Sequence, residues 1–242
     1  MDIGGSGIKG CVVDLDEGRL MGERIRVETP KPSLPAAVYA AVGEIVAQFG
    51  WTGRVGVTFP GVMKRGVAHT AANVDKSWIG TDVDAGLDRL VPGTVETLND
   101  ADAAGIAEMR YGAGRGRSGV VLMLTFGTGI GSALFVDGHL VPNTEFGHIQ
   151  VDGEDGERRA SAAAREREEL GYPEWATRVD RYLDVLEAGL WPDLIIVGGG
   201  VSKKAAKWVP LLSTRTPVLA AELQNDAGIV GAALAAAEQL EP

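Results

Sequence analysis

Three glycine-rich turns at the ends of apolar, strand-like runs constrain the fold of this chain more than any other feature. The longest is the segment 120–132, VVLMLTFGTGIGS, in which a fully apolar run breaks into three alternating glycines. Because glycine has no side chain, backbone N–H groups in such a turn can approach a ligand closely, as in an anion cradle. The same residues also suit a tight hairpin that leads into the next strand, 132–138. Both interpretations place a sharp turn at the end of a buried strand.

The other two glycine turns argue against the common nucleotide-binding motifs. The turn at residues 4–7 runs into a strand-like segment at 8–15. A dinucleotide-binding fingerprint needs a helix there, and the chain contains no GxxxxGK[ST] sequence. The third turn, at 198–202, follows the apolar run 193–197. If hairpin turns on two facing sheets hold the phosphate, the chain should form two lobes with a cleft between them.

The strand before the first turn is very short. Only Asp2 and Ile3 stand between Met1 and the glycines, whereas a phosphate loop needs a strand to position it. We therefore expect either a late start, a shortened chain, or a neighbouring segment that takes the place of the strand.

Length and composition favour a globular protein of one large or two small domains. The chain has 242 residues, 45% hydrophobic and 23% charged, so it can bury a sizeable core. Its net charge of −10 argues against a general nucleic-acid-binding surface. The single cysteine, Cys11, excludes an internal disulfide, and no His/Cys cluster has zinc spacing. No apolar run is long enough to cross a bilayer and no leader is recognisable, so we expect a cytoplasmic protein without a membrane partner.

Alternating helical and strand-like patterns predict an α/β protein. Apolar residues at helical spacing indicate helices at 36–49, 83–90, 103–111, 157–169, 175–190 and 225–240, and a basic helix begins at 203. Apolar runs bounded by turn residues indicate strands at 8–15, 20–27, 54–59, 95–98, 120–126 and 193–197. The amphipathic helix 175–190 would serve either the core or an interface.

Two polar segments carry candidate functional groups. Asp100 lies where the strand 95–98 becomes a helix, so it would face the positive end of the helix dipole. It suits either an ordinary helix cap or a general base at the mouth of a cleft. Glu145 and His148 lie three residues apart, which allows both to point into one pocket or to form an ordinary hydrogen-bonded loop.

Six motifs in order resemble the sugar kinases of the ROK family (repressor, open reading frame, kinase). They are DIGGSGIKG, LNDADAAG, LTFGTGIGSALF, PNTEFGH, IIVGGGVS and NDAGIVGAA, and they cover the chain from Asp2 to about Ala233. The variants DIGGSGIKG and PNTEFGHIQVDG are similar to the branch that phosphorylates glucose with inorganic polyphosphate. The resemblance implies an α/β, actin/hexokinase-like (ribonuclease H-like) two-lobed fold with a central cleft. The small lobe would comprise 1–98 plus 225–242, and the large lobe 99–224.

The resemblance also implies roles for residues at matching positions. Asp100 matches the catalytic base, and Asp2 is the carboxylate expected to orient Mg²⁺ or its waters. Zinc-bearing relatives have a further sugar-binding glutamate, which follows a cysteine motif. This chain lacks that motif, and Glu157 is assigned to the same role. The residues expected to bind phosphate are Gly4, Gly5, Ser6, Gly7, Lys9, Thr125, Gly127, Thr128, Gly129 and Gly131. Those on the nucleotide side are Gly198, Gly199 and Gly200, and those expected to bind sugar are Asn73, Asn99, Asp100, Glu145, His148 and Glu157.

These assignments predict a homodimeric kinase that makes glucose 6-phosphate from glucose, with polyphosphate and also ATP as donor and Mg²⁺ as cofactor. Phosphoryl transfer asks the protein mainly for positioning and charge stabilisation, which glycine loops and a metal ion supply. An anion path for long polyphosphate would use Lys9, Arg115, Arg117, Lys203 and Lys204.

Two alternative functions stay open. One is an ATP-dependent kinase for mannose, fructose or an N-acetylated amino sugar. The other is a catalytically weak sugar-binding protein, which the short first strand suggests.

Overall fold

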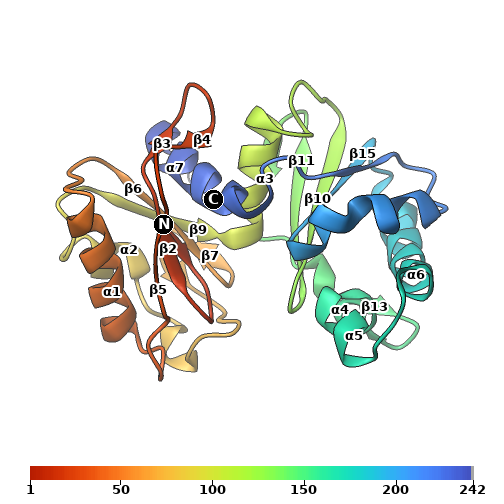
Figure 1. Ribbon diagram of the computed structural model, residues 1–242, viewed down its shortest axis with the longest axis horizontal. Coiled ribbons are helices and arrows are strands. Elements are labelled where there is room, and N and C mark those ends of the chain that lie inside the picture. The colour runs from red at the N-terminus through yellow and green to blue at the C-terminus, as the bar shows by residue number, and fades with distance from the viewer. Residues whose placement is uncertain (241–242) are drawn as a thin grey trace. The chain divides into compact units, whose positions relative to one another are not determined.

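The computed structural model describes residues 1–240, which cluster into two compact units (Figure 1). The first unit contains Met1–Ala107 and the C-terminal segment from Asp226, and the second contains Glu108–Asn225. The division falls inside helix α3 (Asp100–Tyr111), not at the predicted lobe boundary before Asn99. The first turns of α3 belong to the first unit because they pack closely against the C-terminal segment. The two backbones are so close that a side chain at Gly231 would collide with the Ala103 carbonyl group. The end of the predicted small lobe, 241–242, lies outside the described residues.

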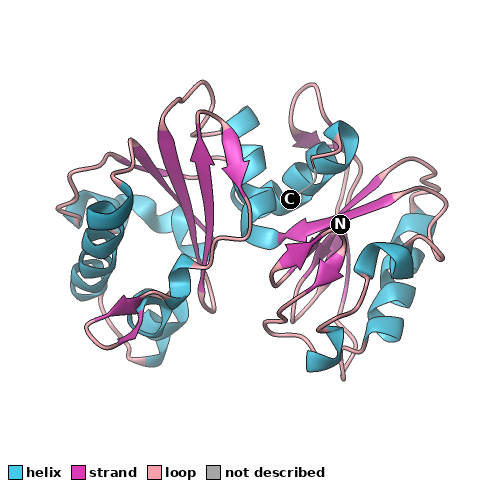
Figure 2. Ribbon diagram, turned by 180° about the vertical axis from the view of Figure 1, so that it is seen from behind, coloured by secondary structure: helices cyan, strands magenta, loops and turns pink. Residues whose placement is uncertain are grey.

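Each unit is built on a five-stranded mixed sheet with the same pattern of pairing (Figure 2). In both sheets the first three strands are antiparallel, and two parallel strands complete the sheet. The first sheet has the order β5 (Ile25–Val27), β2 (Ile8–Gly10), β1 (Asp2–Ile3), β6 (Val55–Phe59), β9 (Val95–Asn99). The second has the order β12 (His139–Val141), β11 (Ile130–Val136), β10 (Val120–Phe126), β15 (Leu194–Gly198), β16 (Val218–Ala220). The α/β class predicted from the sequence is therefore correct.

Helices cover both faces of the first sheet (Figure 1). Helices α1 (Pro35–Gln48) and α2 (Val83–Leu87) bury an apolar stripe, which in α1 consists of Val38, Val42 and Ile45 at helical spacing. Helix α7 (Ala227–Glu238) is rich in alanine and glycine, so it approaches the sheet closely. A side chain at Gly56 would collide with the Ala232 carbonyl group. The predicted helices at 36–49 and 225–240 are confirmed, with the second slightly shorter than expected.

In the second unit, one face of helix α6 (Tyr172–Leu190) is buried in the core. Its buried residues include Trp175, Val179 and Tyr182, and the Trp175 ring packs 4.8 Å from the Trp208 ring, centroid to centroid. The single helix predicted at 157–169 is wrong. The structure has α4 (Gly156–Ala160) and α5 (Ala162–Arg167), separated by Ser161, whose extended backbone and side-chain bond to Ala164 N–H cap the second helix.

The remaining elements are short. The predicted strands at 8–15 and 20–27 are each interrupted, because a small hairpin of β3 (Val13–Asp14) and β4 (Arg19–Leu20) separates from the main sheet. Two further hairpins are β7 (Met63–Lys64) with β8 (Val67–Ala68) and β13 (Gln150–Val151) with β14 (Glu154–Asp155). The 3-10 helices are Lys76–Trp78, Phe146–His148, Gly200–Lys207, Val209–Leu211 and Gln224–Asp226, of which Gly200–Lys207 replaces the helix predicted from 203.

Within residues 1–240, no helix combines the length and the apolar character that crossing a membrane requires.

Asp84 in α2 provides a pH-dependent test of the packing in the first unit. Burial raises the pKa of its carboxyl from 3.8 to about 6. A carboxyl whose pKa is raised by folding stabilises the protein below its unfolded pKa, and this contribution is lost as pH rises through the folded pKa. We therefore expect the free energy of unfolding to fall by about 1–2 kcal/mol between roughly pH 4 and pH 6 because of Asp84, after a discount for partial exposure.

Urea denaturation across this pH range would measure the effect. Asp84→Asn should remove this part of the fall and stabilise the protein near neutral pH, whereas Asp16→Asn, at an exposed turn position, should follow the unmodified protein. An unchanged pH profile in Asp84→Asn would contradict the assignment.

Candidate active site

The first glycine turn joins β1 to β2 and is packed by two side chains. A Cβ at Gly5 would lie 2.8 Å from the Cβ of Asn73, and a Cβ at Gly7 would lie 2.8 Å from the Arg26 guanidinium. Arg26 Nη2 also donates a hydrogen bond to Ser6 O at 3.0 Å. Asn73, which the sequence analysis assigned to sugar binding, therefore lies against this turn. Arg26 lies there as well and was missed.

Asp2 and Lys9 face each other across the β1–β2 ladder. The Lys9 ammonium lies 3.4 Å from Asp2 Oδ2, and Asp2 Oδ1 accepts a hydrogen bond from Thr58 Oγ1 at 2.9 Å. The half-buried carboxylate is thus held in one orientation at the base of the turn. An anion in the turn would lie close to both a cation and a carboxylate.

The surroundings of Asp2 suit a metal ion that is shared with a substrate. Residues 1–240 contain no group of three or more His, Cys, Asp or Glu side chains that could hold a metal ion by themselves. Mg²⁺ usually keeps several waters and binds one or two carboxylates together with substrate phosphates. A lone carboxylate beside a glycine turn fits that mode of binding.

Asn99 and Asp100 have different positions and contacts at the start of α3. Asn99 Oδ1 accepts hydrogen bonds from Ala101 N–H at 2.8 Å and Asp102 N–H at 3.1 Å, so Asn99 is the residue that caps the helix. Its Nδ2 donates to Gly61 O at 3.1 Å, which fixes the amide. Asp100 is exposed at the first helical position, and its Oδ1 accepts from the Ala101 N–H at 2.8 Å. The capping role therefore belongs mainly to Asn99, and the Asp100 carboxylate faces the solvent.

The second glycine turn is an open hairpin. Phe126 in β10 pairs with Ile130 in β11, which leaves Gly127, Thr128 and Gly129 as the turn. Gly127 and Thr128 are exposed, and a Cβ at Gly127 would meet no atom within 4 Å. The hairpin interpretation is confirmed, and the Gly127 backbone is bonded within the protein, because its N–H donates to Gly129 O and its C=O accepts from Ala163 N–H. Two of the residues predicted to bind phosphate, Thr125 and Gly131, face each other in the flanking strands.

A cluster of three carboxylates surrounds His148 in the second unit. His148 Nε2 lies 3.9 Å from Glu145 Oε2, and His148 Nδ1 lies 3.4 Å from Asp155 Oδ2 and 3.9 Å from Glu157 Oε1. Burial raises the pKa of Glu145, and of its charged neighbours His148 lowers it while Glu157 raises it. The structure thus brings together the predicted residues Glu145, His148 and Glu157. Asp155 was missed, because its position in a short hairpin gave no signal in the sequence.

Glu157 connects this cluster to the second glycine turn. Its Oε2 accepts a hydrogen bond from Ile130 N–H at 3.1 Å, and a Cβ at Gly129 would collide with the same oxygen. The absence of a side chain at Gly129 therefore makes room for Glu157. Oxygen acceptors on several side chains and one imidazole form an arrangement suited to binding neighbouring hydroxyl groups.

The third glycine turn lies next to the second, because Gly198 in β15 is the register partner of Thr125 in β10. Gly199 has φ of 79°, and a side chain there would collide with the Phe126 carbonyl group. Between the two turns lies a pocket of about 340 Å³. Its lining comprises Phe126, Gly127, Thr128, Ala162, Ala163, Arg165, Glu166, Tyr172, Gly200, Val201 and Lys204.

Two cations near the Tyr172 ring, at this pocket, were not predicted from the sequence. The Arg165 guanidinium lies 4.7 Å from the centre of the Tyr172 ring, and the Lys207 ammonium lies 6.0 Å from it. Of the basic residues predicted to form an anion path, Lys204 is part of the lining, whereas Lys203 is not. Arginine and tyrosine at this distance form a cation–π contact, which local sequence patterns do not reveal.

Comparison with known proteins gives consistent results. The profile of the ROK family matches residues 1–169. The chain is 57% identical over 236 residues to a polyphosphate glucokinase of Mycobacterium tuberculosis, which covers 97% of this chain and 89% of the relative. It is 55% identical to the polyphosphate glucokinase of Mycobacterium leprae, over 97% of this chain and 73% of the relative.

Solved structures agree in fold. The inorganic polyphosphate/ATP-glucomannokinase of Arthrobacter sp. strain KM superimposes with a TM-score of 0.94 at 53% identity, covering 98% of this chain and 97% of the other. A ROK family glucokinase of Streptomyces griseus, solved with glucose and AMPPNP, gives a TM-score of 0.83 at 27% identity, with 98% of each chain covered. The predicted actin/hexokinase-like fold is thereby confirmed, and the chain belongs to the ROK family of sugar kinases and their relatives.

Proposed function

We propose that this protein phosphorylates glucose to glucose 6-phosphate, with inorganic polyphosphate and ATP as phosphoryl donors. The observation that carries the proposal is the 57% identity, over 97% of the chain, to a protein named polyphosphate glucokinase. Use of ATP is supported by the name of the Arthrobacter relative, a polyphosphate/ATP-glucomannokinase. The same name supports mannose as a second acceptor.

Asp100 is proposed as the general base. It is exposed at the start of α3, and its Oδ1 shares the Ala101 N–H with Asn99 Oδ1, which also accepts from the Asp102 N–H. A carboxylate there can accept the proton of the primary hydroxyl as the sugar oxygen attacks the phosphorus atom.

The glucose hydroxyl groups would be bound by Asn73, Asn99, Glu145, His148 and Glu157. The acidic cluster around His148 offers paired acceptors, and an imidazole donor lies within 4 Å of each carboxylate. A site of this kind discriminates against epimers, because a misplaced hydroxyl leaves a polar group unpaired.

The donor phosphates would be bound by the glycine turns at 4–7 and 127–129. In each turn one N–H closes the turn itself, from Gly4 to Gly7 O and from Gly127 to Gly129 O, so the N–H groups of the other turn residues would bind the donor. A divalent cation, for which we propose Mg²⁺, would be held by Asp2 and would neutralise charge on the phosphate oxygens. The pocket beside Gly127 would hold the remainder of the donor, either nucleoside or further phosphates. A homodimer and a cytoplasmic location stay predictions.

Asp100→Asn should abolish turnover with both donors while glucose still binds. We expect kcat to fall by about a thousandfold, because general-base catalysis and charge at the attacking oxygen are both lost. Glucose 6-phosphate formation with polyphosphate and with ATP, measured separately, gives the rates, and thermal stabilisation by glucose gives binding. Asp137→Asn, at an exposed turn outside the site, is the control. Retention of more than about a tenth of the activity would exclude Asp100 as the base.

Two alanine substitutions in one turn should separate donor binding from sugar binding. At Gly127 a Cβ meets no protein atom, so Gly127→Ala should fold normally and raise KM for the donor by about tenfold. At Gly129 a Cβ collides with Glu157, so Gly129→Ala should displace that carboxylate and raise KM for glucose instead. Steady-state kinetics with each substrate varied in turn would measure both constants. Identical effects of the two variants would contradict the separate roles.

Lys204→Ala should weaken use of polyphosphate more than Lys203→Ala. Lys204 lines the pocket beside the glycine turns, and its neighbour Lys203 does not. Loss of one cation from an anion path should lower kcat/KM for polyphosphate by about fivefold and make this constant less sensitive to salt. Both changes should be smaller in Lys203→Ala. Equal activities of the two variants would remove Lys204 from the path.

A further inference from the structure

A second pocket in the second unit is lined mainly by arginines, and we call it the arginine pocket. It has a volume of about 560 Å³ and shares no lining residue with the pocket beside Gly127. Its lining comprises Glu154, Arg158, Arg159, Arg167, Glu168 and Arg178. Four guanidinium groups thus stand against two carboxylates, in a chain whose net charge is −10. The arginine pocket concentrates positive charge that the chain as a whole lacks.

One carboxylate fixes the orientation of two of these guanidinium groups. Glu168 Oε2 lies 2.6 Å from Arg178 Nη1, and Glu168 Oε1 accepts a hydrogen bond from Arg167 Nη2 at 3.0 Å. These bonds lower the pKa of Glu168, so the carboxylate stays ionised near neutral pH. Arg167 Nη2 also donates to Arg158 O at 2.9 Å. The Arg167 and Arg178 side chains are therefore held in place before any ligand arrives.

N–H donors outnumber oxygen acceptors in the arginine pocket, because each guanidinium carries five donors in a planar fork. Arg159 lies 3.4 Å from Asp152, but this carboxylate also accepts from Arg181 Nη2 at 2.8 Å. The Arg158 side chain is exposed. The surplus donors need acceptors from solvent or from a ligand. A phosphate group matches them well, because its oxygens fit the guanidinium fork.

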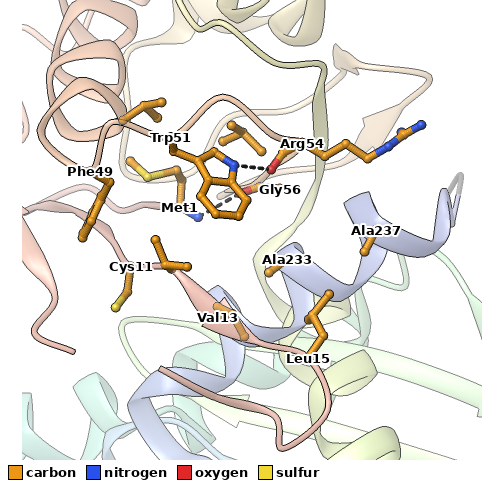
Figure 3. Close-up of a pocket in the computed structure, with 13 residues that line it drawn as sticks. Met1, Cys11, Val13, Leu15, Phe49, Trp51, Arg54, Gly56, Ala233 and Ala237 are labelled. Atoms are coloured by element: carbon orange, nitrogen blue, oxygen red, sulfur yellow. Dashed lines mark hydrogen bonds between the residues drawn. The ribbon is translucent and has the colours of Figure 1, made fainter. Parts of the chain in front are cut away.

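A pocket of about 350 Å³ in the first unit differs in chemistry, as Figure 3 shows. Its lining is mostly apolar and includes Val46, Phe49 and Trp51. The side chain of Arg54 extends away from the other labelled side chains (Figure 3). An anion has little to bind there, whereas the arginine pocket offers it several cations.

Helix α5 connects the arginine pocket to the pocket beside Gly127. Arg165 lines the pocket beside Gly127, and Arg167 lines the arginine pocket. Residues two positions apart on a helix do not face each other, so one short helix serves both pockets. Since α5 has six residues, it is only about 9 Å long. A chain of phosphate groups that leaves the first pocket can therefore reach the second along this helix.

We propose that the arginine pocket binds phosphate groups of a polyphosphate chain that lie beyond those held at the glycine turns. The inference rests on the proposed use of polyphosphate as a donor. A chain held at two sites has a high effective concentration at each, so the second site would strengthen binding of long polyphosphate. ATP and tripolyphosphate have three phosphate groups each, which the site at the glycine turns would occupy. They would not extend to the arginine pocket.

Replacement of two exposed arginines tests the proposal. In Arg158→Gln/Arg167→Gln, KM for long-chain polyphosphate should rise about tenfold, while KM values for tripolyphosphate, ATP and glucose stay unchanged. The glucose constant and Tm verify that the neighbouring Glu157 and the fold are undisturbed. Arg54→Gln/Arg89→Gln removes the same charge from exposed positions in the first unit and should change none of the four constants.

Three results would overturn the proposal. An unchanged KM for long-chain polyphosphate in Arg158→Gln/Arg167→Gln would show that the arginine pocket does not bind the chain. A similar rise for tripolyphosphate or ATP would show that these arginines act on the site at the glycine turns. A similar rise in the first-unit control would show that the charge of the whole protein, and not this pocket, sets the affinity.

A binding measurement without glucose separates failure of this inference from failure of the proposed function. Ultrafiltration with long-chain polyphosphate gives Kd without turnover, and Kd should rise about tenfold in Arg158→Gln/Arg167→Gln. If the unmodified protein uses ATP but not polyphosphate, the proposed donor is wrong, and this inference is wrong with it. If the unmodified protein uses both donors and Kd is the same in the variant, only this inference is wrong.

Discussion

The arrangement of the candidate site depends on one feature of strand pairing, the junction of an antiparallel hairpin with a parallel strand in each sheet. The hairpin supplies a tight turn, and the parallel strand next to it ends at the same edge. In the second sheet this brings Gly198 beside Thr125, and so places two glycine turns around one pocket. In the first sheet it brings the carboxyl end of β6 beside Asp2, where Thr58 orients the carboxylate. Both units therefore place a hairpin turn and the end of a parallel strand at one edge of a sheet.

Much of the fold and of the candidate site was predictable from the sequence, because local residue patterns determine it. Apolar runs and glycines gave the strands and turns, and ordered motifs gave the family and the residues now found near each turn. The prediction failed at one helix cap that was overlooked and at contacts between residues apart in the sequence. Ser161 divides a segment that reads as one charged helix, since its side chain caps the second half. Arg26 reaches the first turn only through the pairing of β2 with β5, and Asp155 reaches His148 only through a short hairpin.

The candidate site contains a cluster of acidic side chains and, apart from it, a cluster of basic ones. Three carboxylates gather around His148, whereas cations gather over Tyr172 beside the glycine turns. The acidic and basic clusters thus lie in separate parts of one unit.

The path of the chain sets an order for its assembly. The second unit is formed by one continuous segment, Glu108–Asn225, whereas the first needs helix α7 from the far end of the sequence. Its sheet keeps an uncovered face at Gly56 until α7 has been synthesised. On the ribosome, the segment made in the middle can therefore complete its core before the segment made first. Nascent chains that end before Ala227 would expose apolar strand surface around Gly56.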